Sequence, residues 1–403
     1  MTKRVVFYDR YTSGHRPYIQ AIIRAHLQPS DYTFQIVTGP EGKRSLAFLM
    51  ELWERDKFHH CHMLTLDDCL QDFNEYNEVL WFINAGITLS ATLYQFTFLS
   101  PHIALMKGLC SSPRYVKSQL KSILRVMKSR TVDTTAGTDE RTSQVWRYPL
   151  YIEDFKATLK VMKSGIMSAV AIPDERISQV WRYPVWRDKL RLLPDPAAFN
   201  AALMPSRKAK LALGWDPAIP TLLMFGTMYR YKGLDILLEA LSERFGHHYN
   251  GPLRVVLAGK QVDERKKVTL SPAVEFIEYD CYIEQPFADQ LFSAADCVVM
   301  PFVKEFDQSS GTFSLACASG KFTIVPNQGI LGWRVRKLRN GNVYKPGDPA
   351  SLAKAISRFV DRYSALSFPI EGSLKYADTC TPSRYVEEID SIIRESFGTV
   401  HYA

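Results

Sequence analysis

The sequence of 403 residues lacks the cysteine patterns of disulfide-rich secreted proteins and of zinc sites. Its seven cysteines include no CxxC pair and no even spacing, so we expect reduced thiols rather than a disulfide framework. The chain begins MTKRVVFYDRY, which predicts a strand and contains no apolar region typical of a secretion signal. Together these absences predict a cytoplasmic protein.

Clusters of metal-ligating residues are also scarce. The stretch HHCH at 59–62 resembles one, but it falls in an expected strand. Alternation along a strand puts His60 and His62 on one face and His59 and Cys61 on the other, so these four side chains do not converge. No metal site is expected, and no cofactor either.

Charged residues are absent from 79–106. Judged by its length alone, this stretch could cross a bilayer. Asn84, Gln95 and Pro101 interrupt it, and Gly86 splits it. Strands of a parallel sheet also read as continuous apolar runs. We therefore expect two buried strands joined by a mostly buried helix, with a membrane span as the alternative.

The charge balance is positive, with a formal net charge of +8. This favours an anionic partner such as a nucleotide or a phospholipid surface, and no motif points to nucleic acid. Part of the excess lies in RYVKSQLKSILRVMKSR, a basic amphipathic helix from Arg114 to Arg130. It is either a domain helix with a solvated basic face or a peripheral docking site on the inner face of an anionic membrane.

Length and strand pattern predict two domains, because a single core rarely grows beyond about 250–300 residues. Apolar strands alternate with helical stretches in both halves, which favours parallel sheets in two doubly wound, Rossmann-like α/β domains facing a cleft. We place the domains at 1–190 and 191–380, with a helix in 381–403 packing back on the first. Strands are expected at 5–9, 33–39, near 59–66, and at 79–85, 102–106, 189–193, 221–226, 253–259, 274–279, 297–302 and 322–326.

Two stretches of the second half could carry chemistry. In FGTMYRYKGLDILLEAL (225–241) a strand ends at Gly226, and a short loop carries Arg230 and Lys232 before a helix that begins at Gly233. Cations, loop amides and a helix N-terminus can together hold a diphosphate. The alternative is that both cations are solvated surface charges.

The other stretch is PFVKEFDQSSGTFSLACASG (301–320), where small polar residues open an apolar helix. Their amides could meet a phosphate, with Ser or Thr capping the helix. Glu305 and Asp307 are expected to face the same cleft. The alternative is an ordinary helix cap with two solvated acids. The small polar residues are Ser309, Ser310, Gly311 and Thr312.

In this order the two stretches resemble the donor-binding domain of GT-B glycosyltransferases, especially the retaining, nucleotide-sugar-dependent group that includes bacterial mannosyl- and glucosyltransferases. That group has a strand–Gly–basic loop–KG–helix pattern, here FGTMYRYKG, and later E-x7-E before A-x-A-x-G-x-P-V, here degraded to LACASGKFTIV. The resemblance covers about 191–348; the N-terminal half shares only the layout.

The resemblance implies that Lys232 binds the donor diphosphate, with Arg230 as a nearby candidate. Thr227 stands where many relatives carry Arg. The E-x7-E pair falls on Asp307 and Leu315, and leucine cannot hold a ribose. Asp307, or Glu305 after a small gap, would lie near the transferred sugar. Ribose recognition and donor identity therefore stay open.

The resemblance implies two further groups of site residues, one for the nucleotide base and one for the acceptor. Tyr282 and Ile283 occupy the strand end that usually contacts the base. In the N-terminal half, TSGHR (12–16) follows the first strand, so Gly14 and Arg16 are acceptor-side candidates and His15 is a catalytic one. The alternative for His15 is a loop-capping role.

The activity implied is transfer of a sugar from a nucleoside diphosphate sugar, as co-substrate, to an unidentified acceptor, with retention of configuration. A non-catalytic homologue that binds a nucleotide or glycan and serves a partner protein is the alternative. A GT-B epimerase is a third hypothesis; it would act without an acceptor.

A repeat separates the halves: SQVWRYP occurs at 143–149 and at 178–184. Aligning 124–149 with 159–184 gives 16 identities in 26 positions, which indicates a tandem duplication. The second copy carries GIMSAVAIPDE, which predicts a buried strand. The first carries the polar RTVDTTAGTDE instead. We expect 130–164 to be an insertion outside the core sheet, and the tryptophan segments to be framework.

Overall fold

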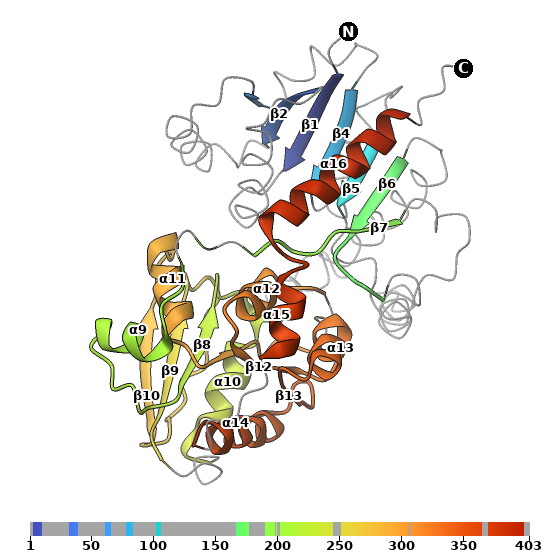
Figure 1. The fold of residues 1–403 in the computed structure, drawn as a ribbon. Coiled ribbons are helices and arrows are strands. Elements are labelled where there is room, and N and C mark those ends of the chain that lie inside the picture. The colour runs from blue at the N-terminus through green and yellow to red at the C-terminus, as the bar shows by residue number, and fades with distance from the viewer. Residues whose placement is uncertain are drawn as a thin grey trace, which may run out of the picture. The chain divides into compact units, whose positions relative to one another are not determined.

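The computed structural model describes residues 3–9, 32–38, 61–65, 78–83, 102–105, 167–176, 190–197, 199, 202–244, 251–304, 306, 308–364 and 370–398. The chain forms two compact units. Unit 1 comprises Met1–Pro194 and Pro382–Ala403, and unit 2 comprises Asp195–Thr381 (Figure 1). The sequence pattern predicts the corresponding boundaries after residues 190 and 380.

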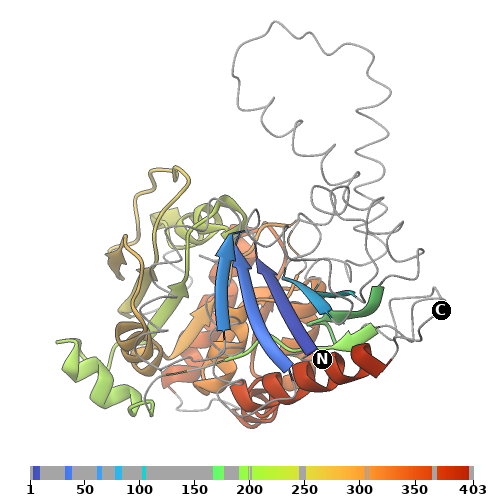
Figure 2. The same cartoon turned by 90° about the horizontal axis from the view of Figure 1, so that it is seen from above.

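Unit 1 contains a seven-stranded parallel sheet in the order β3-β2-β1-β4-β5-β6-β7. Helix α16 (Pro382–Gly398) contacts β4, β5 and β6, and Figures 1 and 2 both show it lying along this sheet. The strands are β1 (Lys3–Asp9), β2 (Tyr32–Thr38), β3 (Cys61–Thr65), β4 (Glu78–Ile83), β5 (His102–Leu105), β6 (Met167–Ile172) and β7 (Leu190–Leu192).

The charge-free stretch 79–106 supplies two neighbouring strands of this sheet. β4 and β5 pair in parallel from Leu80 opposite His102 to Ile83 opposite Leu105, which confirms the two expected strands. The segment between them lies outside the described residues. Among the described helices, none is long and apolar enough to cross a membrane.

The second copy of the duplicated segment supplies β6, as its apolar run predicted. β6 is hydrogen bonded directly to β5, the strand that precedes the duplication in the sequence. The sheet therefore runs without interruption from β5 to β6. Both SQVWRYP segments and the whole of 130–164 lie outside the described residues, so their placement stays a prediction.

Unit 2 contains a six-stranded parallel sheet in the order β10-β9-β8-β11-β12-β13. Every residue of β9 and β12 is buried, because helices cover both faces. This alternation of parallel strands and helices confirms the predicted fold class. The strands are β8 (Thr221–Phe225), β9 (Leu253–Ala258), β10 (Val274–Tyr279), β11 (Cys297–Val299), β12 (Phe322–Pro326) and β13 (Gly341–Tyr344).

The helices of unit 2 divide between two apolar clusters. Helices α10 and α14 share one cluster through residues such as Leu237 and Phe359. The other cluster includes Phe292 of α11 and Phe313 of α12, and it also takes in α9, α13 and α15. The helices are α9 (Ser206–Ala212), α10 (Leu234–Ala240), α11 (Gln285–Ala294), α12 (Gly311–Ala318), α13 (Gly329–Leu338), α14 (Pro349–Ser364) and α15 (Glu371–Ala377).

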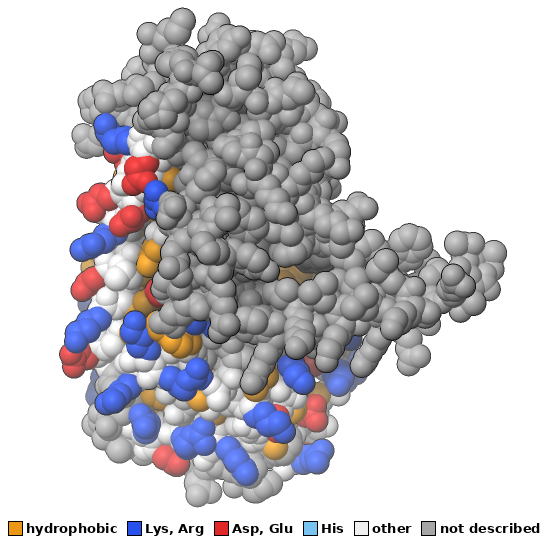
Figure 3. All heavy atoms as spheres, turned by 90° about the vertical axis from the view of Figure 1, so that its right-hand side faces the viewer, with side chains coloured by type: hydrophobic (Ala, Val, Ile, Leu, Met, Phe, Trp, Pro, Cys, Tyr) orange, Lys and Arg blue, Asp and Glu red, His pale blue; other side chains and the backbone are white. Residues whose placement is uncertain are grey.

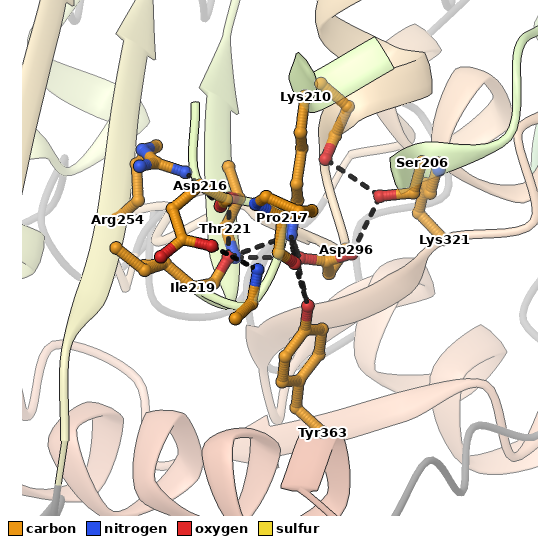
Figure 4. A network of polar contacts seen from close by, with 12 residues as sticks. Ser206, Lys210, Asp216, Pro217, Ile219, Thr221, Arg254, Asp296, Lys321 and Tyr363 are labelled. Carbon is orange, nitrogen blue, oxygen red and sulfur yellow. Dashed lines mark hydrogen bonds and ion pairs between the residues drawn. The ribbon is translucent and has the colours of Figure 1, made fainter. Parts of the chain in front are cut away.

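A buried ion pair fastens the amino ends of β8 and β11 (Figure 4). Lys210 Nζ of α9 lies 2.5 Å from Asp296 Oδ2 and 3.2 Å from the Tyr363 hydroxyl of α14. The other donors to Asp296 are the Ser206 hydroxyl, 3.0 Å from Oδ1, and the Thr221 amide, 2.9 Å from Oδ2. Burial lowers the pKa of Lys210 even though Asp296 opposes the shift. This network stabilises the sheet at the end opposite to the carboxyl ends of the strands.

Positive charge gathers on the surface of unit 2. Figure 3 shows one face, on which Lys and Arg side chains outnumber Asp and Glu. Helices α13 and α14 together expose five cations, and Asp361 is the one acidic residue that the two helices contain. Part of the net charge of +8 is therefore carried by these helices. The exposed cations are Arg336, Lys337, Lys354, Arg358 and Arg362.

Candidate functional site

The loop after β8 touches the loop after β9 backbone to backbone. Gly226 has φ 95° and donates its amide to the Ala258 carbonyl at 2.9 Å. A Cβ on Gly259 would lie 2.2 Å from the Gly226 carbonyl oxygen. Only glycine fits this approach, which explains why glycine ends both strands in the sequence.

The same loop also meets the loop after β11. Gly233 has φ 75° and precedes α10, and a Cβ there would lie 1.9 Å from the Pro301 carbonyl oxygen. The loops that follow β8, β9 and β11 therefore converge at the carboxyl ends of these strands. Open α/β sheets bind ligands beyond this end.

Lys232 lies in the 3-10 turn η3 (Arg230–Lys232) between β8 and α10. Its Nζ donates to the Phe225 carbonyl at 3.0 Å and lies 5.8 Å from the centroid of the Phe302 ring. Burial lowers the pKa of this amine from 10.5 to about 8. No carboxylate in the described part of the chain pairs with it. An ammonium carries three donors, so this cation can still serve an anionic ligand.

Arg230 and Thr227 have different surroundings from Lys232. Arg230 is exposed, and its backbone amide donates to Asp263 Oδ2 at 2.6 Å. Thr227 is partly buried directly after Gly226, and its carbonyl accepts the Tyr229 amide at 3.1 Å. Within this loop Lys232 is therefore the packed cation and Arg230 the solvated one.

The helix that the small polar residues open is α12, and it begins at Gly311. A serine, Ser310, occupies the N-cap as predicted, but its side chain makes no capping hydrogen bond. The neighbouring Ser309 hydroxyl donates instead to Asp195 Oδ2 at 2.5 Å, and both residues are buried. The amides of Gly311 and Thr312 belong to the first turn of the helix, where amides have no acceptor within the helix.

The residues expected near the nucleotide base and ribose fall partly in the core. Leu315 of α12 packs against the apolar cluster around Phe313. Ile283 is buried in the same cluster, whereas Tyr282 beside it is exposed. Of these three side chains, Tyr282 is exposed, Leu315 is half-buried and Ile283 is buried.

Five of the predicted site residues lie outside the described part of the chain and stay predictions. They are Gly14, His15, Arg16, Glu305 and Asp307. The basic helix 114–130 and the side chains of HHCH are likewise not described. Among the described residues, no group of three or more His, Cys, Asp or Glu could hold a metal ion.

An aromatic stack beside Lys232 was not predicted. The rings of Tyr229 and Tyr231 stack at 5.6 Å, and Tyr231 stacks on Phe306 at 5.4 Å with planes 5° apart. Phe306 stacks in turn on Phe302 at 3.9 Å. In the sequence, the stack is indicated only by the alternating tyrosines of MYRY. The partner rings, Phe302 and Phe306, come from a distant segment, so the local pattern does not reveal them.

The two sheets define a GT-B fold, and solved structures of glycosyltransferases superpose over almost the whole chain. Sucrose-phosphate synthase from Thermosynechococcus elongatus has a TM-score of 0.64 at 14% identity, covering 98% of this chain and 99% of that one. A glycosyltransferase from Rickettsia africae has a TM-score of 0.62 at 14% identity and covers 99% of each chain. Anabaena HepE in complex with UDP-glucose has a TM-score of 0.62 at 14% identity, covering 98% and 100%. The predicted resemblance to GT-B proteins is thereby confirmed.

The sequence match is confined to unit 2. Residues 219–362 match the family model of glycosyl transferases group 1. This segment starts just before β8 and ends within α14, so it contains the converging loops, Lys232 and the first turn of α12. No curated protein matches the sequence.

Proposed function

We propose that the protein is a glycosyltransferase that moves a sugar from a nucleoside diphosphate sugar to an acceptor, with retention of configuration. The observation that carries the proposal is Lys232, a packed cation without a carboxylate partner among the described residues, at the carboxyl end of β8. It lies inside the segment that matches glycosyl transferases group 1. HepE was solved with UDP-glucose, so UDP-sugars are the first donors to test.

Lys232 would act on the leaving group. During transfer, the bond between the anomeric carbon and the diphosphate oxygen breaks, and its electron pair leaves with the diphosphate. The ammonium of Lys232 and the amides of Gly311 and Thr312 would stabilise this charge where little water surrounds it. Arg230 would add a second, more solvated cation. Ser309 and Ser310 would line the same turn.

The acceptor oxygen forms the new bond to the anomeric carbon, and its proton must be removed. Asp307, or Glu305, is proposed to lie near the transferred sugar, and His15 is proposed on the acceptor side with Gly14 and Arg16. The acceptor is a glycan, a lipid-linked sugar or a small molecule. A lipid-linked acceptor would fit a role in polysaccharide biosynthesis at the membrane, with helix 114–130 docking on anionic lipids.

A non-catalytic role is the second candidate, and Leu315 favours it. The resemblance places the ribose-binding acid of E-x7-E at this position, but Leu315 packs into the apolar cluster. A protein that has lost ribose recognition could bind a nucleotide or glycan and serve a partner without transferring sugar.

A donor panel tests both candidates. The full chain is titrated calorimetrically with UDP-, GDP- and ADP-sugars, and release of the nucleoside diphosphate is measured with and without candidate acceptors. A glycosyltransferase binds one donor and releases its diphosphate, and Lys232→Ala weakens both. Lys375→Ala is the matched control, because Lys375 is exposed and paired with Glu371 on α15. Binding without release favours the non-catalytic role, and absence of any donor binding refutes the proposal.

A further inference from the structure

One side chain, Gln328, fastens the turn that follows β11. Gln328 lies between β12 and α13, at the N-cap of that helix. Its Nε2 donates to two carbonyls, Val303 at 2.9 Å and Phe306 at 2.7 Å. Both hydrogens of the amide are therefore used on a single turn, which the Phe306 amide also closes by donating to the Val303 carbonyl at 3.0 Å.

The fastened turn is in direct contact with the residue before Lys232. The Val303 amide donates to the Tyr231 carbonyl at 3.0 Å. The Phe306 ring stacks on the Tyr231 ring with centroids 5.4 Å apart. Contacts thus run from Gln328 through Val303 and Phe306 to Tyr231, the covalent neighbour of Lys232.

We propose that Gln328 is a positioning residue of the diphosphate site: by holding the turn 303–306 against η3, it keeps Lys232 in place. This inference rests on the proposed function for its catalytic consequence, although the contacts themselves do not. In the sequence, Phe306 is flanked by the two proposed carboxylates, Glu305 and Asp307.

The chemistry of the two acceptors explains why glutamine stands at this position. Two carbonyl oxygens require two donors on one terminal group, which a primary amide supplies and a carboxylate or thioether does not. A shorter asparagine would lack one methylene of reach. Glutamine also brings no charge to compete with Lys232 for the diphosphate.

The test uses the full chain with Gln328→Met, which keeps the length, and Gln328→Glu, which replaces the donors by acceptors. Gln285→Met is the matched control, because the Gln285 amide donates to Asp289 within its own helix α11 rather than to the turn after β11. The first readout is acetylation of Lys232 by acetic anhydride as a function of pH, followed by peptide mass spectrometry. It requires no nucleotide.

In the wild type, acetylation of Lys232 should rise with an inflection near pH 8, because burial lowers the pKa of this amine. In both Gln328 variants water reaches the amine, so the inflection should move up by about one pH unit or more, and amides of 303–306 should exchange faster. The Gln285 control should titrate like the wild type. If the Gln328 variants also keep the wild-type inflection, the positioning role is refuted, even where the melting temperature falls.

Kinetics with the donor found by the panel provide the second readout. Loss of an outer residue that orients a binding group typically costs about 10–100-fold, so we expect kcat/KM to fall by that factor in the Gln328 variants only. If the panel finds no donor, while the Lys232 inflection lies near pH 8 in the wild type and moves up in the Gln328 variants, the proposed function is refuted and the positioning role stands. A shifted inflection with unchanged kcat/KM would refute the catalytic consequence.

Discussion

Replacing Lys232 by methionine should make the protein more stable and less active. Lys→Met keeps the length of the side chain and removes its charge. Folding lowers the pKa of this amine from 10.5 to about 8 by burial, so the charged form is disfavoured in the folded state. A shift of this size corresponds to about 3 kcal/mol at pH 7, with 1.36 kcal/mol per pKa unit.

Part of this gain is lost with the hydrogen bond from Nζ to the Phe225 carbonyl. A hydrogen bond that involves a charged group contributes about 1.5–3 kcal/mol. The net effect expected at pH 7 is therefore a gain in the free energy of unfolding of roughly 1 kcal/mol. The same ammonium should contribute a charge-assisted contact to the donor diphosphate, so binding of the nucleotide sugar should weaken about 10–100-fold.

The lowered pKa of Lys232 also determines how the free energy of unfolding changes with pH. Between pH 8 and pH 10.5 the amine keeps its proton in the unfolded chain and loses it in the folded one. The unfolded state then binds more protons, so the stability of the wild type rises with pH in this window. The variant lacks this rise. Its advantage should be largest below pH 8, should vanish near pH 9, and should reverse by about pH 10, where the wild type has gained about 2–3 kcal/mol.

Pulse proteolysis across a urea series can measure the difference in the free energy of unfolding between the variant and the wild type. Peptides from 251–304 that survive proteolysis are detected by mass spectrometry, so that the measurement reports on unit 2 alone. The control is Lys375→Met, because the Lys375 side chain is 74% exposed and paired with Glu371. A Lys232→Met variant that is less stable than the wild type at pH 7, or whose advantage is the same at pH 7 and pH 10, would refute the reasoning.

Other predictions follow from the same contacts. Lys210→Met should lower the free energy of unfolding by about 3–5 kcal/mol, because it leaves the buried Asp296 carboxylate without its cation, while nucleotide binding in calorimetry stays intact. Gly233→Ala should cost about 2–5 kcal/mol in urea unfolding, since the new Cβ would lie 1.9 Å from the Pro301 carbonyl oxygen. Gly347→Ala, with a similar φ of 70° and nothing within 4 Å, should cost only about 1–2 kcal/mol. The kcat/KM for the donor should fall above about pH 8 as Lys232 loses its proton, and this inflection should vanish in Lys232→Met.

The strands of unit 2 could be predicted because each core strand is an apolar run bounded by turn residues. LLMF in β8 and VVLA in β9 are examples. β13 escaped prediction since it begins at Gly341 and contains Asn342, which read as a turn. A Cβ on Gly341 would lie 2.0 Å from the Thr323 carbonyl oxygen, so close packing against β12 selects this glycine. β11 ends at Val299 rather than at the expected residue 302. Two residues after this end lies Pro301, which has no amide hydrogen to continue the hydrogen bonding of the strand.

The candidate site was predictable where its residues are local in the sequence. Gly226, Lys232 and Gly233 fall within eight positions of one loop, so the sequence could propose them together for a diphosphate site, with solvated surface cations as the alternative. The hydrogen bond from Ser309 to Asp195 could not be predicted, because the two residues lie 114 positions apart and nothing in the local pattern reveals their contact. Gln328 escaped for the same reason, since its contacts with Val303 and Phe306 span more than twenty positions.

The resemblance to GT-B enzymes implies two differences from their pattern, and these would affect different parts of the donor. With Thr227 a cation near the diphosphate would be missing, and with Leu315, which packs against the apolar cluster, an acid that holds the ribose would be missing. With both contacts gone, recognition of the donor would rest more heavily on one desolvated ammonium, Lys232, and on helix amides. A cation that has little water to lose has a smaller desolvation penalty when the diphosphate arrives, so burial of Lys232 would compensate in part for the missing arginine. The same burial brings its pKa close to physiological pH, so under the proposed function donor binding would depend strongly on the contact of Val303 and Phe306 with η3.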